Sequence, residues 1–524
     1  MAAMFTRRAL LGGAAMGASA VVAARLGGPV QGVPPGILDV VTPDSPLYDR
    51  LASRGYNPRF RAAPQEILVP HDTSAVVRAV QRAVDSETRI GLRAGGHCFE
   101  GFADRPEVAA LLDLGRLRAV GFDHAYRAFS VGAAADLGSV YQCLYRGWGV
   151  TVPGGTCLGV GAAGLISGGG FGGLSRRFGV AADHLYGVEL VAVDASGQAR
   201  AVVATRDGPN RDLWWAHTGG GGGNFGVITR FLMRSPVSDG SDPSTALPVP
   251  PRRMCVGRLH LVVPTVEAFV SFVGNFLSFL HDHRAPGAPA TALYSTLYAG
   301  SLLSGGCSVQ TYFGAEAQHV YDDFVAAMSR GVWPRPVPAQ TSEGPFLPET
   351  LRYCTPRGRS AMSVKYKSAF LRTPYSNAQL RTLHRFLSDP SIVDGGSGIQ
   401  FFALGGQIGA VAPGQTALAE RRSIAKVQIL GGWSDPRQSA CRIRWTREFY
   451  RALYANTGGV PQPDRRNGGC YINYPDTDMA DPEWNPALPW HHLYYQDNYP
   501  RLQEVKSAWD PQNRFSHPLG VTST

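Results

Sequence analysis

Three glycine-rich loops constrain the fold of this chain more than any other feature of its sequence. The first is R-A-G-G-H at 93–97, the second runs from P-G-G-T-C at 153–157 to G-G-G at 168–170, and the third is G-G-G-G-G-N-F-G at 219–226. Glycine costs conformational entropy on folding, but it lets the backbone approach a ligand closely and present N–H groups to phosphate or carbonyl oxygens. The loops therefore indicate turns built around a ligand.

Two other interpretations of these loops are weaker. A five-glycine run can be a flexible linker, yet Trp214 and Trp215 before it and N-F-G-V-I at 224–228 after it favour a packed turn. The segment 159–164 matches the G-x-G-x-x-G fingerprint of nicotinamide-nucleotide folds, with Asp183 downstream. That fold needs a strand running straight into the turn and a helix leaving it, whereas the glycines at 154–155 and 168–170 break both.

Composition favours a large folded enzyme. The 524 residues are 44% hydrophobic and 17% charged, and the 63 glycines and 38 prolines are spread among apolar residues rather than set in polar repeats. The formal net charge is +10, but the arginine pairs at 176–177, 252–253 and 465–466 are scattered. Nucleic-acid binding would need basic residues clustered on one helix or stripe, so no nucleic-acid partner is expected.

Hydrophobic periodicity predicts an α+β protein in two regions. The first contains a helix over 73–84 and a hairpin over 188–204, and a segment rich in Pro, Ser and Asp at 236–251 separates it from the second. In the second region we expect strands at 256–263, 309–313, 400–405 and 426–431, and helices at 266–280, 320–328, 377–387 and 444–457.

Together with Y-I-N-Y-P-D at 471–476, the glycine loops resemble those of the berberine-bridge-enzyme-like flavin oxidases over nearly the whole mature chain. The resemblance implies a two-lobed PCMH-type FAD-binding domain over 31–243, completed by a C-terminal berberine-bridge-like segment at 465–524. Between them, at 244–464, it implies a substrate domain with an antiparallel sheet flanked by helices.

The resemblance also implies FAD held by two covalent bonds, from His97 to the flavin 8α-methyl carbon and from Cys157 to C6. Imidazole and thiolate are side chains able to attack an electrophilic ring, and each follows glycines that let the ring come close. In isolation, a core histidine and a buried thiol would explain these two residues equally well. The full set expected at the cofactor is His97, Cys157, Arg93, Gly95, Gly96, Gly154, Gly155, Thr156, Gly161, Gly164, Gly168, Gly169, Gly222, Gly223, Asn224, Phe225, Gly226, Val227, Tyr471 and Asn473.

Tyr474 is the candidate catalytic base, because the family's tyrosine in this motif takes the proton of the substrate hydroxyl. A free phenol titrates near ~10, so the residue needs a neighbouring donor or positive charge that the sequence does not identify. The alternative is a packing aromatic. Some relatives carry a second catalytic tyrosine where this chain has Leu404, which argues against a second, independent oxidation.

The expected reaction transfers a hydride from a carbinol or hemiacetal carbon of a small-molecule substrate to FAD, with molecular oxygen reduced to hydrogen peroxide. The substrate is an alcohol on a natural product or, alternatively, a carbohydrate oxidised to a lactone. A flavin-binding protein without catalysis is a third hypothesis, against which the complete motif around Tyr474 speaks.

No metal site is expected, because His491, His492 and His517 lack partners at a ligand-like helical spacing. These histidines are expected at the surface or beyond the residues in direct contact with the cofactor. The eight cysteines show no C-x-x-C spacing, and Cys98 is interpreted as structural.

The N-terminus resembles a twin-arginine signal peptide over 1–30, with Arg7 and Arg8 ahead of a small apolar stretch. An amphipathic helix is the alternative, but glycines at 12, 13 and 17 are costly in a helix interior. We expect the export machinery to carry the folded protein out of the cytoplasm, with no membrane span remaining.

Replacing Arg7 and Arg8 by lysines should therefore trap the folded, yellow protein inside the cell. Flavin absorbance of cell and medium fractions measures this outcome. Secretion at the wild-type level would show that the N-terminus is not a twin-arginine signal.

Overall fold

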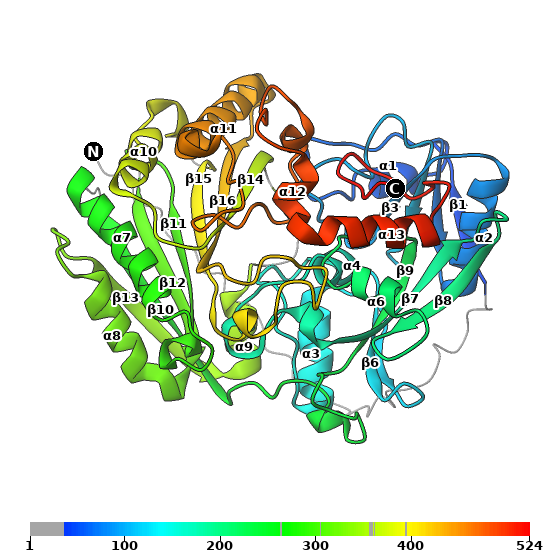
Figure 1. The fold of residues 1–524 in the computed structure, drawn as a ribbon, viewed down its shortest axis with the longest axis horizontal. Helices are drawn as coiled ribbons and strands as arrows, with labels where there is room; N and C mark the ends of the chain where they lie inside the picture. Colours follow the sequence, from blue (N-terminus) through cyan, green and yellow to red (C-terminus); the bar gives the residue numbers. More distant parts are fainter. Residues whose placement is uncertain (1–35, 263–264, 304, 356–359, 361, 394–395) are drawn as a thin grey trace, which may run out of the picture. The chain divides into compact units, whose positions relative to one another are not determined.

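The described strands form three sheets that follow one another along the chain. The computed structural model describes residues 36–524 except 263–264, 304, 356–359, 361 and 394–395 (Figure 1). The predicted signal peptide at 1–30 lies outside the described residues.

Two smaller sheets contain the strands between residues 38 and 233. A four-stranded sheet has the order β1-β2-β4-β3 and a five-stranded sheet the order β5-β6-β9-β7-β8. β2, β4 and β3 run parallel, whereas the other neighbours are antiparallel. The strands are β1 (Leu38–Val41), β2 (Glu66–Pro70), β3 (Ile90–Arg93), β4 (Ala110–Asp113), β5 (Val120–Asp123), β6 (Ala128–Gly132), β7 (Leu185–Val193), β8 (Ala199–Thr205) and β9 (Val227–Met233). The predicted hairpin is confirmed as β7 and β8.

A seven-stranded antiparallel sheet follows, in the order β13-β10-β12-β11-β15-β16-β14. Its strands are β10 (Arg253–Val262), β11 (Leu293–Ala299), β12 (Gly306–Gly314), β13 (Val337–Pro345), β14 (Ser363–Leu371), β15 (Gly398–Ala403) and β16 (Ala425–Trp433). The change of sheet between β9 and β10 falls at the Pro-rich segment predicted to separate two regions. The exact domain limits stay a prediction.

Helices α7, α8, α10 and α11 cover the seven-stranded sheet on the side away from the smaller sheets (Figure 1). The Thr265 side chain accepts a hydrogen bond from the Ala268 N–H and starts α7, whose Phe269, Phe272 and Phe276 are fully buried. The helices are α1 (Tyr48–Ala52), α2 (Thr73–Asp85), α3 (Leu137–Trp148), α4 (Ala162–Ser167), α5 (Ser175–Phe178), α6 (Arg211–Ala216), α7 (Val266–Asp282), α8 (Gln318–Met328), α9 (Phe346–Tyr353), α10 (Asn377–Leu387), α11 (Ser439–Leu453), α12 (Trp490–Tyr495) and α13 (Tyr499–Trp509).

The predicted helix over 377–387 is confirmed at both ends, because Ser376 and Gln379 form a capping box that defines its start. The helix predicted over 444–457 instead begins at Ser439 and ends at Leu453, where a 3₁₀ turn takes over. The sequence did not predict β14, because two lysines interrupt its apolar pattern; both Lys365 and Lys367 are buried.

The six-residue helix α4 explains why the G-x-G-x-x-G match was misleading. It starts after Gly161 and stops at Gly168, and the segment before it forms only isolated β-bridges, at Cys157 and Gly161, rather than a strand. The predicted break on both sides of the fingerprint is confirmed.

The C-terminal segment returns to the half of the molecule that carries the glycine loops (Figure 1). The ammonium of Lys506 in α13 donates hydrogen bonds to the carbonyls of Asn224 and Phe515 and pairs with Asp510 at 2.6 Å. The Val521 N–H donates to the Asn224 side chain. Residues far apart in the sequence therefore fix the third glycine loop.

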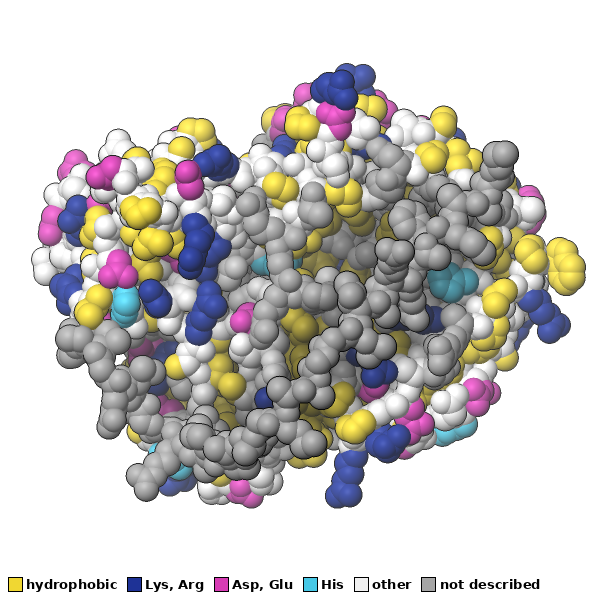
Figure 2. All heavy atoms as spheres, turned by 180° about the vertical axis from the view of Figure 1, so that it is seen from behind, with side chains coloured by type: hydrophobic (Ala, Val, Ile, Leu, Met, Phe, Trp, Pro, Cys, Tyr) yellow, Lys and Arg dark blue, Asp and Glu magenta, His cyan; other side chains and the backbone are white. Residues whose placement is uncertain are grey.

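Lysine and arginine side chains lie dispersed among acidic, polar and apolar ones on the face in Figure 2. Within the described ranges, no helix has both the length and the apolar character needed to cross a bilayer. All eight cysteines belong to the described residues, and each is a free thiol there.

Candidate active site

One large cavity joins the three glycine loops to the 471–475 segment and to residues 515–517. It contains about 1860 Å³ of space not filled by protein atoms, including open solvent at its mouth. The residues predicted from the sequence that line it are Arg93, Gly95, Gly96, His97, Gly155, Thr156, Cys157, Gly161, Gly164, Gly222, Gly223, Gly226, Val227, Tyr471, Asn473 and Tyr474.

Five residues expected at the cofactor lie behind the cavity wall: Gly154, Gly168, Gly169, Asn224 and Phe225. A Cβ at Gly168 would lie 2.1 Å from the Asn473 side chain, so this glycine serves packing. Asn224 uses its side chain to hold the Gly220 carbonyl and the C-terminal segment, and Phe225 is buried against His217. At Gly154, Gly168 and Gly169, neighbouring protein side chains, rather than a ligand, take the space that a side chain would need.

The first two glycine loops touch directly at Gly95 and Gly161. A Cβ built on Gly95 would lie 2.4 Å from the Gly161 nitrogen, and one on Gly161 would lie 2.6 Å from the Gly95 Cα. Gly96 adopts a φ of 76°, a left-handed conformation that side chains rarely adopt. A side chain at Gly95 or Gly161 would push the two loops apart, and one at Gly96 would strain the backbone.

This contact brings the two predicted nucleophiles together. The Cys157 Sγ lies 3.3 Å from His97 Nε2, and the Tyr56 ring stacks on the imidazole with ring centroids 3.8 Å apart. Burial lowers the pKa of His97 to about 4 and raises that of the Cys157 thiol. The imidazole is therefore neutral and lies within hydrogen-bond distance of a thiol that keeps its proton.

Two other residues of the first loop have structural partners. The Arg93 guanidinium is buried 2.9 Å from Asp113, which stabilises the loop rather than leaving the charge free for a ligand. The Cys98 thiol donates to the Glu100 carbonyl, and burial raises its pKa to about 12, as expected of a structural cysteine.

Tyr474 has one close polar partner at its hydroxyl that the sequence did not identify. The Lys426 ammonium lies 3.0 Å from the Tyr474 oxygen, on β16. Burial raises the pKa of the Tyr474 phenol well above its ordinary value and lowers that of Lys426 to about 7. The lysine therefore exchanges a proton near neutrality while the phenol stays protonated.

Aromatic rings surround Lys426. Its nitrogen lies 4.2 Å from the centroid of the Tyr474 ring, 4.7 Å from Phe402, 4.8 Å from Tyr471 and 5.6 Å from Phe171. These rings stabilise the cation only partly, because they replace water with an apolar environment. The signal available in the sequence was a lysine inside an otherwise apolar strand.

Leu404 is buried in an apolar cluster with Phe171, Leu418 and Tyr471. It supplies no hydroxyl to the cavity, in keeping with the single predicted base. Tyr294 and Phe402, which the sequence did not single out, line the cavity together with Lys426.

Comparison with known proteins identifies the relatives of this chain. Residues 64–201 match the FAD binding domain, and residues 470–522 match the family described as berberine and berberine like. Aclacinomycin-N/aclacinomycin-A oxidase of Streptomyces galilaeus is 44% identical, over 99% of this chain and 98% of its own.

The chain belongs to the berberine-bridge-enzyme-like family. It is an FAD-dependent oxidoreductase of this family. Hexose oxidase of Chondrus crispus is 29% identical, over 92% of this chain and 94% of its own. The crystal structure of a glycopeptide hexose oxidase complexed with teicoplanin matches with a TM-score of 0.89 and 38% identity, over 93% of this chain and 99% of that one. The predicted fold class is confirmed.

The cavity of this berberine-bridge-enzyme-like protein fits FAD on the chemistry of its own walls. The glycine loops form a cradle that side chains would fill, and the imidazole and thiol lie side by side in the cavity wall. His517 was expected at the surface or beyond direct contact with the cofactor, but it lines the cavity. Burial lowers the pKa of His517 to about 4, and neither of its ring nitrogens has a hydrogen-bond partner of normal geometry among the described residues. A ligand in the cavity would supply such a partner.

Groups of three or more His, Cys, Asp or Glu side chains able to hold a metal ion are absent from the described part of the chain.

Proposed function

We propose that this protein holds FAD through covalent bonds to His97 and Cys157 and oxidises an alcohol on a natural product to a carbonyl, reducing oxygen to hydrogen peroxide. The observation that carries the proposal is the Tyr474 hydroxyl 3.0 Å from Lys426, in the same cavity as the His97 and Cys157 pair. A base and two attachment points in one cavity are what such an oxidase needs.

FAD, when bound, supplies the hydride acceptor and returns the electrons to oxygen. Tyr474 accepts the proton of the substrate hydroxyl at its phenolic oxygen and passes its own proton to the neutral Lys426 amine. Burial keeps the phenol protonated, so the pair works as a relay rather than through a standing phenolate. Below a pH of about 7 the lysine already carries a proton, and the relay cannot accept another.

The cavity wall around Tyr474 supports a substrate with a large apolar surface. Phe171, Tyr294, Phe402 and Tyr471 line it there, and aromatic rings bind flat apolar groups more strongly than they bind a small sugar. The relatives that act on aclacinomycin or are complexed with teicoplanin support the same class. The hexose oxidase similarity keeps a carbohydrate hemiacetal as the second candidate.

A panel of natural-product alcohols and free hexoses, with peroxide release as the readout, tests the substrate class. Turnover of the hexoses alone would favour lactone formation. Absence of peroxide with every compound, with flavin bound, would favour a binding protein without catalysis. We also propose that the protein is exported through its twin-arginine segment.

The attachment prediction concerns His97 and Cys157. Each single alanine substitution should keep covalent flavin through the remaining bond, and the double substitution should lose it. Mass spectrometry of acid-denatured protein measures this directly. Flavin that leaves the wild-type protein freely on denaturation would contradict the bicovalent proposal.

The base prediction concerns Tyr474→Phe, which removes one oxygen and keeps the ring. Flavin reduction by substrate should slow by roughly 10²- to 10⁴-fold, the usual contribution of a positioned acid or base. The loss should fall on kcat, because proton transfer matters in the transition state, while binding and covalent flavin persist. A variant that reduces its flavin within a few-fold of wild type would make Tyr474 a packing residue.

The pH prediction concerns Lys426. The wild-type reduction rate should rise with pH through about 7, because only the neutral amine can accept the Tyr474 proton. Lys426→Met should lose this pH dependence and react slowly at every pH. Lys426→Arg keeps the charge but cannot lose its proton, so it should also be slow. A fast arginine variant would show that charge alone, without proton acceptance, is required.

A further inference from the structure

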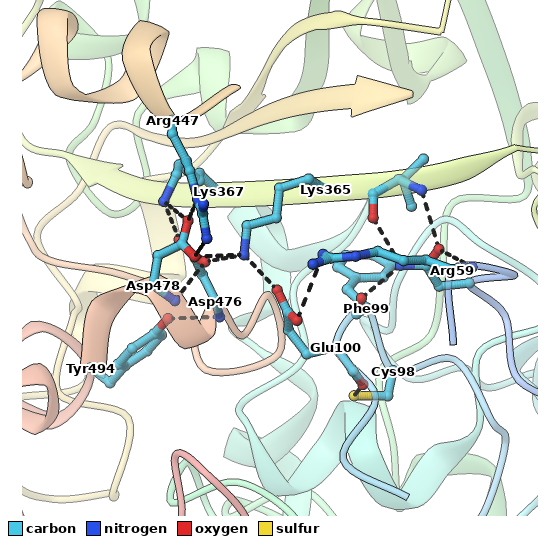
Figure 3. A network of polar contacts seen from close by, with 12 residues as sticks. Arg59, Cys98, Phe99, Glu100, Lys365, Lys367, Arg447, Asp476, Asp478 and Tyr494 are labelled. Atoms are coloured by element: carbon cyan, nitrogen blue, oxygen red, sulfur yellow. Dashed lines mark hydrogen bonds and ion pairs between the residues drawn. The ribbon is translucent and has the colours of Figure 1, made fainter. Parts of the chain in front are cut away.

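A buried ion network joins strand β14 to two loops (Figure 3). We name it the lysine clamp, and it consists of Glu100, Lys365, Lys367, Asp476 and Asp478. It joins three segments that are distant in the sequence: the loop after His97, strand β14, and the turn after Tyr474.

The ion pairs of the lysine clamp are short, and both lysines share Asp476 as a partner. The Lys365 ammonium lies 2.8 Å from Glu100 and 2.6 Å from Asp476. Lys367 lies 2.7 Å from Asp476 and 2.8 Å from Asp478. Lys365 is thus a bridge from the flavin-attachment loop to the turn that carries the candidate base.

Because these ion pairs are buried, breaking one of them would cost more free energy of folding than breaking an exposed pair. The side chains of both lysines are 1% exposed and those of the three acids 5% or less. Burial opposes the charge of Lys365, but Asp476 and Glu100 outweigh it and hold the pKa of this lysine above its ordinary value. Removing one partner alone would leave a buried charge uncompensated, which is strongly destabilising.

The register of the sheet shows which side of β14 each lysine occupies. Phe370 of β14 lies opposite Lys426 of β16, so their side chains share the cavity face. Lys365 and Lys367 are odd-numbered positions on the same strand, and side chains alternate, so they lie on the other face. β14 is an edge strand of the sheet. Residues 474–476 therefore cross this edge. The Tyr474 hydroxyl accepts a hydrogen bond from Lys426 on one face of the sheet, and the Asp476 carboxylate accepts hydrogen bonds from Lys365 and Lys367 on the other.

The turn itself has little regular structure to hold it. Residues 471–476 belong to no helix or strand, and the Tyr474 carbonyl receives a long 3.4 Å hydrogen bond from Ser368. The Asp476 N–H donates to the Tyr494 hydroxyl at 3.1 Å. The charged contacts at Asp476 are the shortest among the contacts described for this turn.

We propose that Lys365 and Lys367 are positioning residues: their ion pairs with Asp476, on the far face of β14, keep the Tyr474 hydroxyl within hydrogen-bond distance of Lys426. The ion pair between Lys365 and Glu100 holds the His97 loop to the same strand. One sheet edge would then set the distance between the attachment loop and the base. The lysines act through Tyr474 and touch no substrate.

The decisive variant removes the bridge without creating a net buried charge. Glu100→Gln with Lys365→Met removes one negative and one positive charge, and each new side chain is similar in shape to the one it replaces. Lys367 still pairs with Asp476 and Asp478, and the partly exposed Arg447 still pairs with Asp478. Asp476→Asn serves as a second variant, because it keeps the shape of the side chain and its acceptance of the Asp478 N–H.

The first readout is the crystal structure of each flavin-loaded variant. The Tyr474 hydroxyl should move at least about 1 Å from its wild-type position on Lys426, a displacement large enough to cost on the order of 10²-fold in rate. A Tyr474 hydroxyl that remains within hydrogen-bond distance of Lys426 in every variant that folds would overturn the proposal.

The second readout rests on the proposed function and uses an alcohol that releases peroxide with the wild type. The kcat should fall on the order of 10²-fold, with KM nearly unchanged and the rise in rate near pH 7 lost. A rate and pH profile equal to wild type would also overturn the proposal. If Tyr474→Phe proves fully active, the proposed role of Tyr474 as base fails, and the crystal structures still test the positioning of Tyr474 by the lysine clamp.

Arg447→Gln is the matched control. Arg447 pairs with Asp478 at 2.7 Å from its partly exposed side, and its loss leaves every contact of both lysines intact. This variant should keep Tyr474 in place and the rate within a few-fold of wild type. An equal loss of rate would mean that any weakening of the 476–480 turn has the same effect, which would contradict a specific role for the lysines.

Discussion

The direct backbone contact between Gly95 and Gly161 is the constraint on which the site depends. Two loops from different parts of the chain meet without side chains between them, at distances that no Cβ could occupy. Because these loops carry His97 and Cys157, their closeness determines that the imidazole and the thiol lie 3.3 Å apart. The glycines shape the cavity in two ways, by opening space for a ligand and by allowing protein segments to touch.

Burial decides the chemistry around Tyr474. In water a lysine near a phenol would stay charged, but the aromatic rings around Lys426 remove its hydration and bring its pKa to about 7. The lysines of the clamp are also buried, but carboxylates lie within 3 Å of each, and those around Lys365 hold its pKa above the ordinary value. The same residue type lies among aromatic rings on one face of the seven-stranded sheet and among carboxylates on the other.

The sequence predicted what local motifs encode. His97, Cys157 and Tyr474 each lie in a short glycine- or aromatic-rich motif, and the fold brings them to one cavity. Gly168 and Gly169, expected at the cofactor, do not line the cavity, and a Cβ at either would meet Asn473 or Leu418. In a sequence, a glycine at a close protein contact looks the same as one at a ligand. Lys426 was not found, since its role depends on rings from three other segments.

Strand β14 is a second case in which the sequence alone did not reveal the role of buried lysines. Its two lysines interrupt the apolar pattern, so no strand was predicted there, whereas acids from two distant loops compensate their charges. Ion pairs between residues that are 265 and 111 positions apart, as for Lys365 with Glu100 and Asp476, leave no periodic pattern in the sequence. The fold class could be predicted because it rests on many ordinary apolar positions, and no single one of them had to be placed correctly.

The wall of the cavity formed by residues 515–517 has a consequence for synthesis. The third glycine loop is held through Asn224 to Val521, which lies 297 residues further along the chain. During translation, the lobe with the first two loops emerges well before this wall exists, and the whole seven-stranded sheet must be made in between. The cavity is therefore complete only after the C-terminal segment has left the ribosome.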